Sequence, residues 1–267
     1  MSAPVRVLIP VGFGFNAEDE TAAAFRMVGA EVDQVHLTDL FARRQPRPIP
    51  QYQVVAFVGG FSYGDHVAGG LVAATRIRAH LRDDLSAFLA GGGRLIGICN
   101  GCQVLARLGL LPGPEEGPPD FEARLDLANN DRLGYRDAWV RLGVDRKSTC
   151  VWTRGLSTIQ VPARHGEGRF VLGSQAALDR LEHRGQVALR YLDTAGKPTE
   201  AWPDNPNGST GGIAAVTDAT GRILGLMPHP EAFLYPWQHP DYSRRKKEIE
   251  AREPDGLAIF RAGVTGF

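Results

Sequence analysis

Residues 94–103 read RLIGICNGCQ, an apolar run followed by a glycine-bounded turn. The apolar part, residues 94–98, is typical of a buried strand, and a helix is expected to begin at about Gly101. Gly97 and Gly101 permit a tight connection that a Cβ would obstruct. The segment therefore predicts a strand, a sharp turn at Cys99 and a helix, which together form one unit of an α/β fold.

The same alternation of strand and helix extends toward the N-terminus. One helix is expected from Asn16, its cap with Asp19 three places on, to about Val28, and Gly29 ends it. A second helix is expected over residues 71–89. Repeated β-α-β units with apolar strands predict a parallel sheet covered by helices. The remaining strands of this half are expected at residues 5–11, 31–37 and 54–58.

The second half of the chain has a different pattern. Residues 121–127 alternate apolar and charged side chains, which favours a strand with one wet face and antiparallel pairing. Hairpin turns are expected at 194–196 and 219–221, and a closing helix over 254–264. We therefore expect a single domain, residues 1–267, of α/β class, with an open, mainly parallel sheet, flanking helices and an antiparallel extension.

The composition limits the class of protein. Lys and Arg number 30, as do Asp and Glu, and a neutral chain is not typical of a nucleic-acid binder. No apolar run approaches the roughly 20 residues of a membrane span, and the N-terminus does not resemble a signal peptide. The 3 cysteines cannot all pair, which fits a reducing compartment. We expect a soluble, cytoplasmic protein without nucleic-acid or membrane partners.

Cys99 is the candidate nucleophile, because Gly97-Ile98-Cys99-Asn100-Gly101 has the form of a nucleophile elbow with Cys in place of Ser. Such a turn aims the sulfur at a helix N-terminus, whose positive end favours the reactive thiolate. The N–H of Asn100 is then placed to donate to an oxyanion. Three other interpretations of Cys99 stay open: a small buried cysteine, a C-x-x-C redox pair with Cys102, and half of a metal site. A closed metal site would need a second cysteine pair, whereas Cys150 stands alone in the sequence.

A cysteine nucleophile needs a base, and the base needs an orienting acid. The segment MPHPE, residues 227–231, offers both. Pro228 and Pro230 favour an extended backbone, in which side chains two residues apart point the same way. Glu231 can therefore reach the imidazole of His229. The sequence predicts His229 as the base and Glu231 as its orienting acid.

Two glycine-rich segments are candidate pocket walls. Gly59-Gly60-Phe61 follows the predicted strand at residues 54–58, so its backbone amides can approach an anionic oxygen. An ordinary loop has the same composition. His165-Gly166-Glu167 is a polar cluster that would either line a pocket or form a turn.

Two other patterns point to different functions. Residues 12–17, GFGFNA, follow a strand and match the dinucleotide fingerprint G-x-G-x-x-A, with Asp33 and Asp39 near the distance expected of a ribose-binding acid. The antiparallel second half argues against a nucleotide site. The basic run at 244–247, next to Glu248, is typical of a solvated helix face.

Taken together, these segments resemble the class I glutamine amidotransferases. The order of the motifs is also that of the family, and the segments span most of the chain. A similar set occurs in the amidotransferase domain at the end of large, single-chain synthetases. The matching segments are GGFSYGD (59–65), CNGCQ (99–103), LLPG (110–113), FEAR (121–124), HGEG (165–168), NPNGS (205–209) and MPHPE (227–231).

The resemblance implies a flavodoxin-like sheet and hydrolysis of L-glutamine by Cys99, His229 and Glu231. It implies that the 59–61 segment and Asn100 hold the oxyanion. Gln103 and the 165–167 cluster would contact the substrate, and residues 12–17 would form a pocket-side loop. It implies no metal, cofactor or redox role in this chain. In the family the ammonia passes to a separate synthetase subunit of purine biosynthesis, which uses ATP and Mg, and many bacteria add a small bridging subunit.

The sequence departs from the family in two places. The family usually carries Arg after its His-Pro-Glu, where this chain has Ala232. We match residues 233–253 to no motif of the family. They would form either a lid or surface loop, or a partner surface with Tyr235, Trp237 and Tyr242 as candidate anchors. Two rival functions remain: another cysteine-elbow hydrolase of similar fold, and a non-catalytic regulatory subunit.

Overall fold

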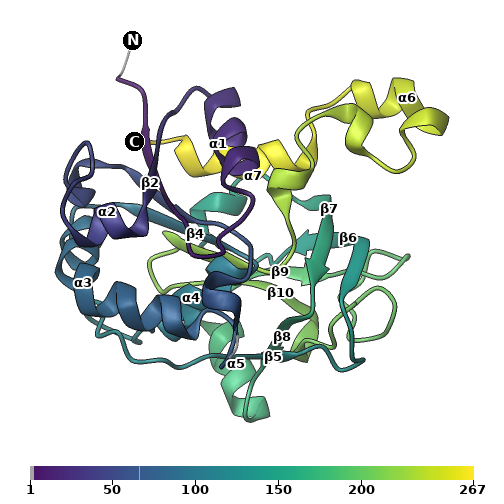
Figure 1. Ribbon diagram of the computed structural model, residues 1–267. Coiled ribbons are helices and arrows are strands. Elements are labelled where there is room, and N and C mark those ends of the chain that lie inside the picture. Colours follow the sequence, from purple (N-terminus) through teal and green to yellow (C-terminus); the bar gives the residue numbers. More distant parts are fainter. Residues whose placement is uncertain (1–2, 66) are drawn as a thin grey trace.

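A nine-stranded mixed sheet forms the centre of the computed structural model, which describes residues 3–65 and 67–267 (Figure 1). The strand order is β2-β1-β3-β4-β11-β10-β9-β6-β7. The first five strands in this order are parallel, and every later pairing is antiparallel. This confirms the predicted fold class. The strands are β1 (Arg6–Val11), β2 (Glu31–His36), β3 (Val54–Phe57), β4 (Arg94–Ile98), β6 (Arg136–Val144), β7 (Thr158–His165), β9 (Val187–Tyr191), β10 (Ile213–Thr217) and β11 (Ile223–Leu226).

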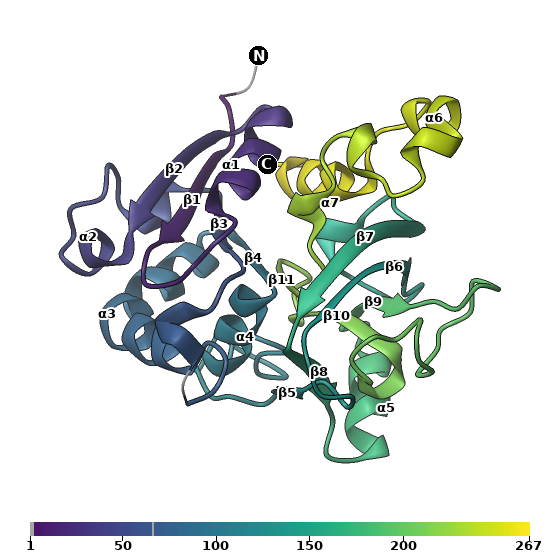
Figure 2. The same ribbon diagram turned by 45° about the vertical axis from the view of Figure 1, so that its right-hand side comes forward.

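Helices cover both faces of the parallel half. In Figure 2, α1 and α7 lie together on one side of the strands, and α3 and α4 lie on the other. A small second sheet pairs β5 (Asp126–Asn129) with β8 (Glu167–Val171). The helices are α1 (Glu18–Met27), α2 (Leu37–Phe41), α3 (Leu71–Ala90), α4 (Asn100–Arg107), α5 (Gln175–His183), α6 (Tyr242–Glu250) and α7 (Asp255–Val264).

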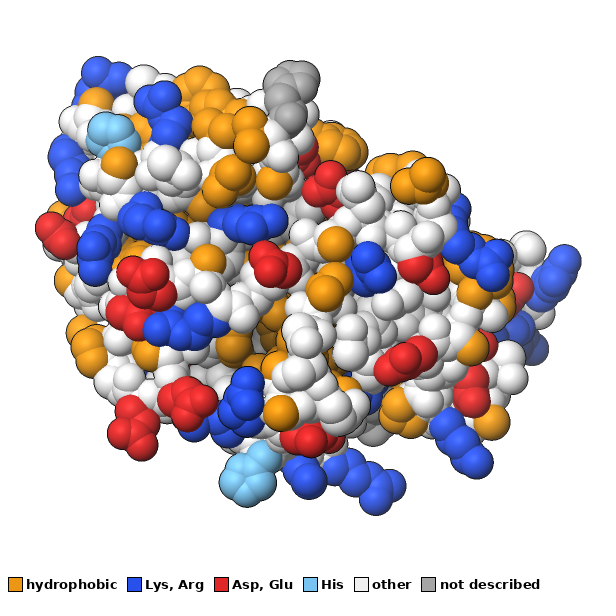
Figure 3. Space-filling model, turned by 90° about the horizontal axis from the view of Figure 1, so that it is seen from below, with side chains coloured by type: hydrophobic (Ala, Val, Ile, Leu, Met, Phe, Trp, Pro, Cys, Tyr) orange, Lys and Arg blue, Asp and Glu red, His pale blue; other side chains and the backbone are white. Residues whose placement is uncertain are grey.

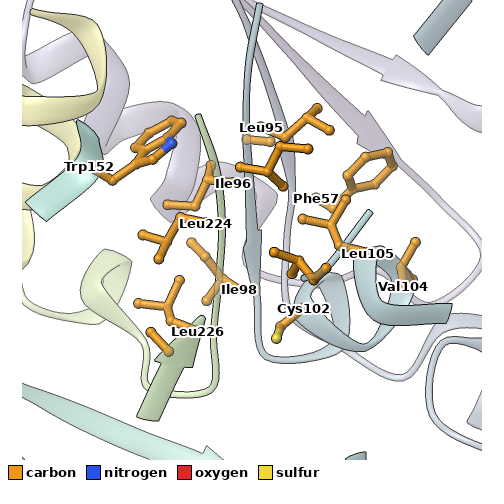
Figure 4. Close-up of a cluster of buried hydrophobic side chains, with 14 of the residues drawn as sticks. Phe57, Leu95, Ile96, Ile98, Cys102, Val104, Leu105, Trp152, Leu224 and Leu226 are labelled. Atoms are coloured by element: carbon orange, nitrogen blue, oxygen red, sulfur yellow. The ribbon is translucent and has the colours of Figure 1, made fainter. Parts of the chain in front are cut away.

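The core lies on both faces of β3, β4 and β11, whose residues are all buried. Strands buried on both faces must be apolar throughout, which explains why these runs do not alternate. Figure 4 shows Val104, Leu105 and Cys102 of α4 packed against this part of the sheet. On the other face, the ring of Phe25 on α1 makes edge contacts with Phe260 on α7 and with Trp152.

Some sequence predictions need correction. The cap of α1 is Ala17, whose φ is +84°, and the side chain of Asn16 only accepts from the N–H of Ala17. Residues 121–125 form no strand, because the chain there passes against Gly109, and pairing starts at Asp126. The expected antiparallel pairing is confirmed for β5.

The two predicted hairpin turns have different outcomes. The turn at 219–221 joins β10 to β11 as expected. The turn at 194–196 also forms, but the chain returns beside β9 through one bridge only, between Leu192 and Pro198. The closing helix is confirmed as α7, with Pro254 as its N-cap.

The surface of the molecule agrees with its balanced charge. On the face seen in Figure 3, Lys and Arg side chains are interspersed with Asp and Glu. Within the residues that the structure describes, none of the helices has the length and apolar character needed to cross a bilayer.

The sheet order brings three chain segments together. Strands β3, β4 and β11 are neighbours and parallel, so their carboxyl ends lie side by side. Gly59 follows β3, Cys99 follows β4 and His229 follows β11. Ligand sites of open α/β sheets form at this edge.

Candidate active site

Cys99 sits at the sharp turn between β4 and α4. Its φ is +52° and its ψ is −108°, a strained conformation for a residue with a side chain. Two glycines make the turn possible. A Cβ on Gly97 would lie 2.5 Å from the carbonyl oxygen of Gly101, and one on Gly101 would lie 2.0 Å from that of Phe57. The turn places Cys99 in the wall of a pocket of about 590 Å³.

His229 is held beside Cys99 by the end of β7. Its backbone N–H donates to the carbonyl of Pro162 at 2.7 Å. Its Nδ1 lies 2.6 Å from Oε1 of Glu231, and its Nε2 lies 3.2 Å from the carbonyl oxygen of Arg164. The Sγ of Cys99 is 3.7 Å from that same carbonyl oxygen, so both side chains meet at Arg164, and Cys99 raises the pKa of His229. The three predicted triad residues therefore lie together.

The electrostatics favour a protonated His229. Burial alone lowers its pKa, but the Glu231 carboxylate and then Cys99 outweigh burial and raise the pKa well above the ordinary value. The imidazolium then donates from Nδ1 to Glu231, and its second N–H faces Arg164 and Cys99. His165 is the opposite case, because burial, with the charges of His229 and Arg136, lowers its pKa to about 3. His165 is therefore neutral at physiological pH.

Gly59 and the 12–17 loop lie next to this pair. A Cβ on Gly59 would lie 3.0 Å from Cε1 of His229, so a larger residue there would crowd the imidazole. The N–H of Asn16 donates to the carbonyl of Gly59 at 2.7 Å, and the N–H of Phe61 donates to that of Gly14 at 2.8 Å. Residues 12–17 thus form a pocket-side loop, as the resemblance implies, with Asn16 and Ala17 in the pocket wall.

The other predicted binding residues are divided between the pocket and the layer behind it. Gly60, Phe61, Gln103 and the 165–167 cluster line the pocket, whereas Gly59 and Asn100 do not. The Nδ1 of His165 is 3.1 Å from Oδ1 of Asn130. Its buried Nε2 has no hydrogen-bond partner among the residues that the structure describes. Glu167 accepts a 3.3 Å hydrogen bond from the N–H of Gly69.

The structure adds pocket residues that sequence reasoning missed. Antiparallel pairing of β6 with β7 places Arg136 opposite His165 and brings the preceding loop to the pocket. This pairing joins segments far apart in the chain, and no local pattern announces it. Three additions lie next to segments that the sequence singled out: Asp65 ends GGFSYGD, Arg164 adjoins His165 and Ala232 follows Glu231. The additional lining residues are Glu20, Asp65, Asn129, Asn130, Leu133, Gly134, Tyr135, Arg164 and Ala232.

Cys102 lies in the core and away from the pocket. It is fully buried, and burial raises the pKa of its thiol. Figure 4 shows its sulfur among apolar side chains, and a Cβ added to Gly225 of β11 would lie 2.8 Å from it. Cys150 is also buried, which raises its pKa to about 11. Across residues 3–65 and 67–267, no three His, Cys, Asp or Glu side chains are grouped to hold a metal ion.

We expect Cys102→Ala to leave any activity that depends on Cys99 within about twofold of wild type, because core changes outside the pocket act mainly on stability. The free energy of unfolding should fall by about 1–2 kcal/mol, since the variant leaves a small cavity. Steady-state kinetics and denaturant titration measure the two quantities. A kinetic loss as large as that of a Cys99 variant would instead restore the redox interpretation.

Comparison with known proteins assigns the class. A family model described as a CobB/CobQ-like glutamine amidotransferase domain matches residues 4–265. The chain therefore belongs to this family of glutamine amidotransferases, which confirms the resemblance.

More specific relatives carry the name phosphoribosylformylglycinamidine synthase subunit PurQ. The protein of that name from Methanococcus maripaludis is 41% identical over 98% of this chain and 97% of its own length. The one from Dehalococcoides mccartyi is 38% identical, covering 97% and 96%. A probable phosphoribosylformylglycinamidine synthase from Arabidopsis thaliana is 36% identical over 93% of this chain but only 18% of its own length.

A solved structure supports the fold. The one described as PurLQS from Thermotoga maritima contains a chain that matches with a TM-score of 0.70 and 24% identity, covering 98% of both chains.

Proposed function

We propose that this chain is the glutaminase component of a phosphoribosylformylglycinamidine synthase. It would hydrolyse glutamine to glutamate and ammonia and supply the ammonia to a synthetase subunit. The observation that carries the chemistry is that Cys99 and His229 share the Arg164 carbonyl oxygen at the wall of a pocket, with Glu231 2.6 Å from the second ring nitrogen of His229. The similarity to relatives named PurQ supports the choice of pathway.

In the first half of the reaction, the Cys99 thiolate attacks the side-chain carboxamide carbon of glutamine. The carbonyl oxygen becomes an oxyanion that accepts hydrogen bonds from backbone N–H groups. As the tetrahedral intermediate collapses, the C–N bond breaks and His229 transfers its proton to the departing nitrogen, so that ammonia leaves. A γ-glutamyl thioester on Cys99 remains.

In the second half, His229 is neutral and removes a proton from a water molecule. The resulting hydroxide attacks the thioester carbon, and the C–S bond breaks. Glutamate is released, and the Cys99 thiolate and the His229 imidazolium are regenerated. Glu231 holds the Nδ1–H of His229 at 2.6 Å throughout, which orients the ring and stabilises its charged form.

The oxyanion donors can be narrowed within the predicted 59–61 segment. The N–H of Phe61 already donates to Gly14, so it is not available for an oxyanion. The N–H of Gly60 donates to no other residue that the structure describes, and Gly60 lines the pocket. We infer that Gly60 and Asn100, the first residue of α4, supply the two donors.

The partner and cofactor assignments follow from the same proposal. The synthetase would be a PurL-type subunit that holds ATP and Mg, and a small PurS-type subunit would bridge the two in organisms that have one. This chain would itself need no cofactor and would work in the cytoplasm. Ammonia release from glutamine, measured with and without the synthetase, tests the proposal. No release under either condition would favour the rival hydrolase or the non-catalytic subunit.

Residues 233–253 offer a surface for the synthetase. They begin at the pocket, where Ala232 is a lining residue, and Figure 1 shows α6 standing out from the body beyond α7. The rings of Tyr235 and Trp237 stack at 4.6 Å, and Trp237 is 61% exposed. Exposed aromatic side chains next to Arg are typical of interface anchors.

The triple variant Trp237→Ala, Arg244→Ala and Arg245→Ala should weaken synthetase binding by about 10-fold or more, because anchor residues often contribute about 2 kcal/mol. The basal glutaminase rate should not change. Titration of the two proteins measures the affinity, and Arg180→Ala with Arg184→Ala on α5 is the charge-matched control. Unaltered affinity in the triple variant would exclude this segment from the interface.

A further inference from the structure

The segment that carries the Gly60 amide has a strained backbone. Tyr63 has a φ of +55° and Asp65 a φ of +50°, values that residues with side chains seldom adopt. Between them, Gly64 has a φ of +75°. Such conformations persist only where the surroundings fix them. The contacts that fix this segment therefore also fix where the Gly60 amide points.

The side chain of Asn100 makes these contacts on both sides of the strained turn. Its Oδ1 accepts from the N–H of Ser62 at 3.1 Å. Its Nδ2 lies 3.2 Å from each carboxylate oxygen of Asp65 and 2.9 Å from Oε1 of Gln103. Asn100 is completely buried, so its side-chain amide forms its hydrogen bonds with these partners rather than with water.

Asp65 extends the same network to the start of α3. Its Oδ1 also accepts from the N–H of Gly70 at 3.2 Å. The neighbouring Gly69 donates to Glu167 across the pocket, and a Cβ on Gly69 would lie 2.3 Å from Nε2 of Gln103. The side chain of the residue directly after the nucleophile thus holds the segment at Ser62 and Asp65. Between them, the N–H of Tyr63 donates to the carbonyl of Phe13 at 2.6 Å.

We propose that the Asn100 side chain is the positioning residue of the oxyanion hole, with Asp65 as its partner. The backbone N–H of Asn100 supplies one donor, and its side chain fixes the segment whose Gly60 supplies the other. Phe61, between Gly60 and Ser62, is held in turn by Gly14. This inference rests on the proposed glutaminase function. It adds a role for the Asn100 side chain, which acts on the transition state without touching the substrate.

The test exchanges the donor and acceptor between the two side chains. Asn100→Asp sets a second carboxylate against Asp65, and the displaced Gly60 amide should cost kcat about 10²–10³-fold, the loss typical of one oxyanion donor. Asp65→Asn alone should lower kcat much less than Asn100→Asp does, because its amide oxygen still accepts from Asn100. In the double variant Asn100→Asp, Asp65→Asn, the hydrogen bond between the two side chains is restored with donor and acceptor exchanged. This variant should recover most of the lost kcat.

Two further measurements separate positioning from general structural support. Glutamate γ-semialdehyde forms an S–C bond with Cys99 and places its oxygen in the oxyanion hole. Its affinity should fall in parallel with kcat. Glutamine affinity, measured in a Cys99→Ala background, should change little. If Asn100→Asp instead acted by displacing Gln103 from the substrate, glutamine affinity or KM would change.

Each outcome decides between explanations. The proposal is supported if Asn100→Asp loses both kcat and affinity for the semialdehyde, and if the double variant recovers both. If Asn100→Asp fails to fold, Asp65→Ala replaces it, and kcat within about threefold of wild type would then overturn the proposal. Retained kcat in Asn100→Asp, or a loss that the second change does not rescue, would also overturn it. A wild-type complex that releases no ammonia would instead overturn the proposed function itself.

Discussion

Replacing Cys99 with Ser should abolish the use of glutamine while free ammonia still supports the synthetase. The expected loss of glutamine-dependent turnover exceeds about 10³-fold, because a hydroxyl lacks the thiolate's nucleophilicity and the remaining groups cannot replace it. Ammonia-dependent turnover should persist, since ATP chemistry is assigned to the partner. The two rates are measured on one preparation of the complex, with glutamine or ammonium chloride as the nitrogen donor.

Cys102→Ala is the matched control for this experiment, because both residues are buried cysteines of the same turn and helix. Only Cys99 lines the pocket. Unchanged glutamine-dependent turnover in Cys99→Ser would remove the nucleophile assignment. Loss of turnover with both glutamine and ammonia would show damage to the complex rather than a specific loss of glutamine hydrolysis.

His229→Ala should cost much more than Glu231→Gln. His229 moves protons in both halves of the reaction, and loss of such a group typically costs about 10²–10⁴-fold. Glu231 orients the ring and compensates its charge, so its amide variant should lose less. Rapid-quench trapping of the thioester checks this. Thioester formation and breakdown at wild-type rates in His229→Ala would show that another group is the base.

The pH profile provides a second readout for Glu231. The protonated imidazole must deliver its proton to the departing nitrogen to form ammonia, so activity should fall as pH rises through the pKa of His229. That pKa is raised by Glu231 and Cys99, which places the alkaline limb above the ordinary range of histidine. Removing the Glu231 charge should move this limb to lower pH. A limb that stays in place in Glu231→Gln would contradict the assigned pairing.

The parts of the fold that were predictable depend on local patterns. The central parallel strands β3, β4 and β11 are almost entirely apolar, and the turn at Cys99 needs glycine on both sides, so both are visible in the sequence. The His229–Glu231 pair is also local, since the two residues are two apart. These features define the sheet edge and the reacting groups.

The parts that were missed depend on contacts between distant segments. Asn130 reaches the pocket because β5 pairs with β8, and Tyr135 because β6 pairs with β7. The hydrogen bond from Phe61 to Gly14 is a backbone contact that no side chain predicts. The expected cap at Asn16 was wrong for the same reason. Its backbone is bound to Gly59, and the helix starts after Ala17.

The central claim is that Cys99 carries the γ-glutamyl group during glutamine hydrolysis. The most direct measurement is acid quench of the complex with glutamine at steady state, followed by peptide mass spectrometry. We predict a γ-glutamyl adduct on the peptide that contains Cys99, lost in Cys99→Ser and accumulating in His229→Ala if deacylation slows more than acylation. Release of ammonia with Cys99 unmodified, or with the adduct on another residue, would contradict the account.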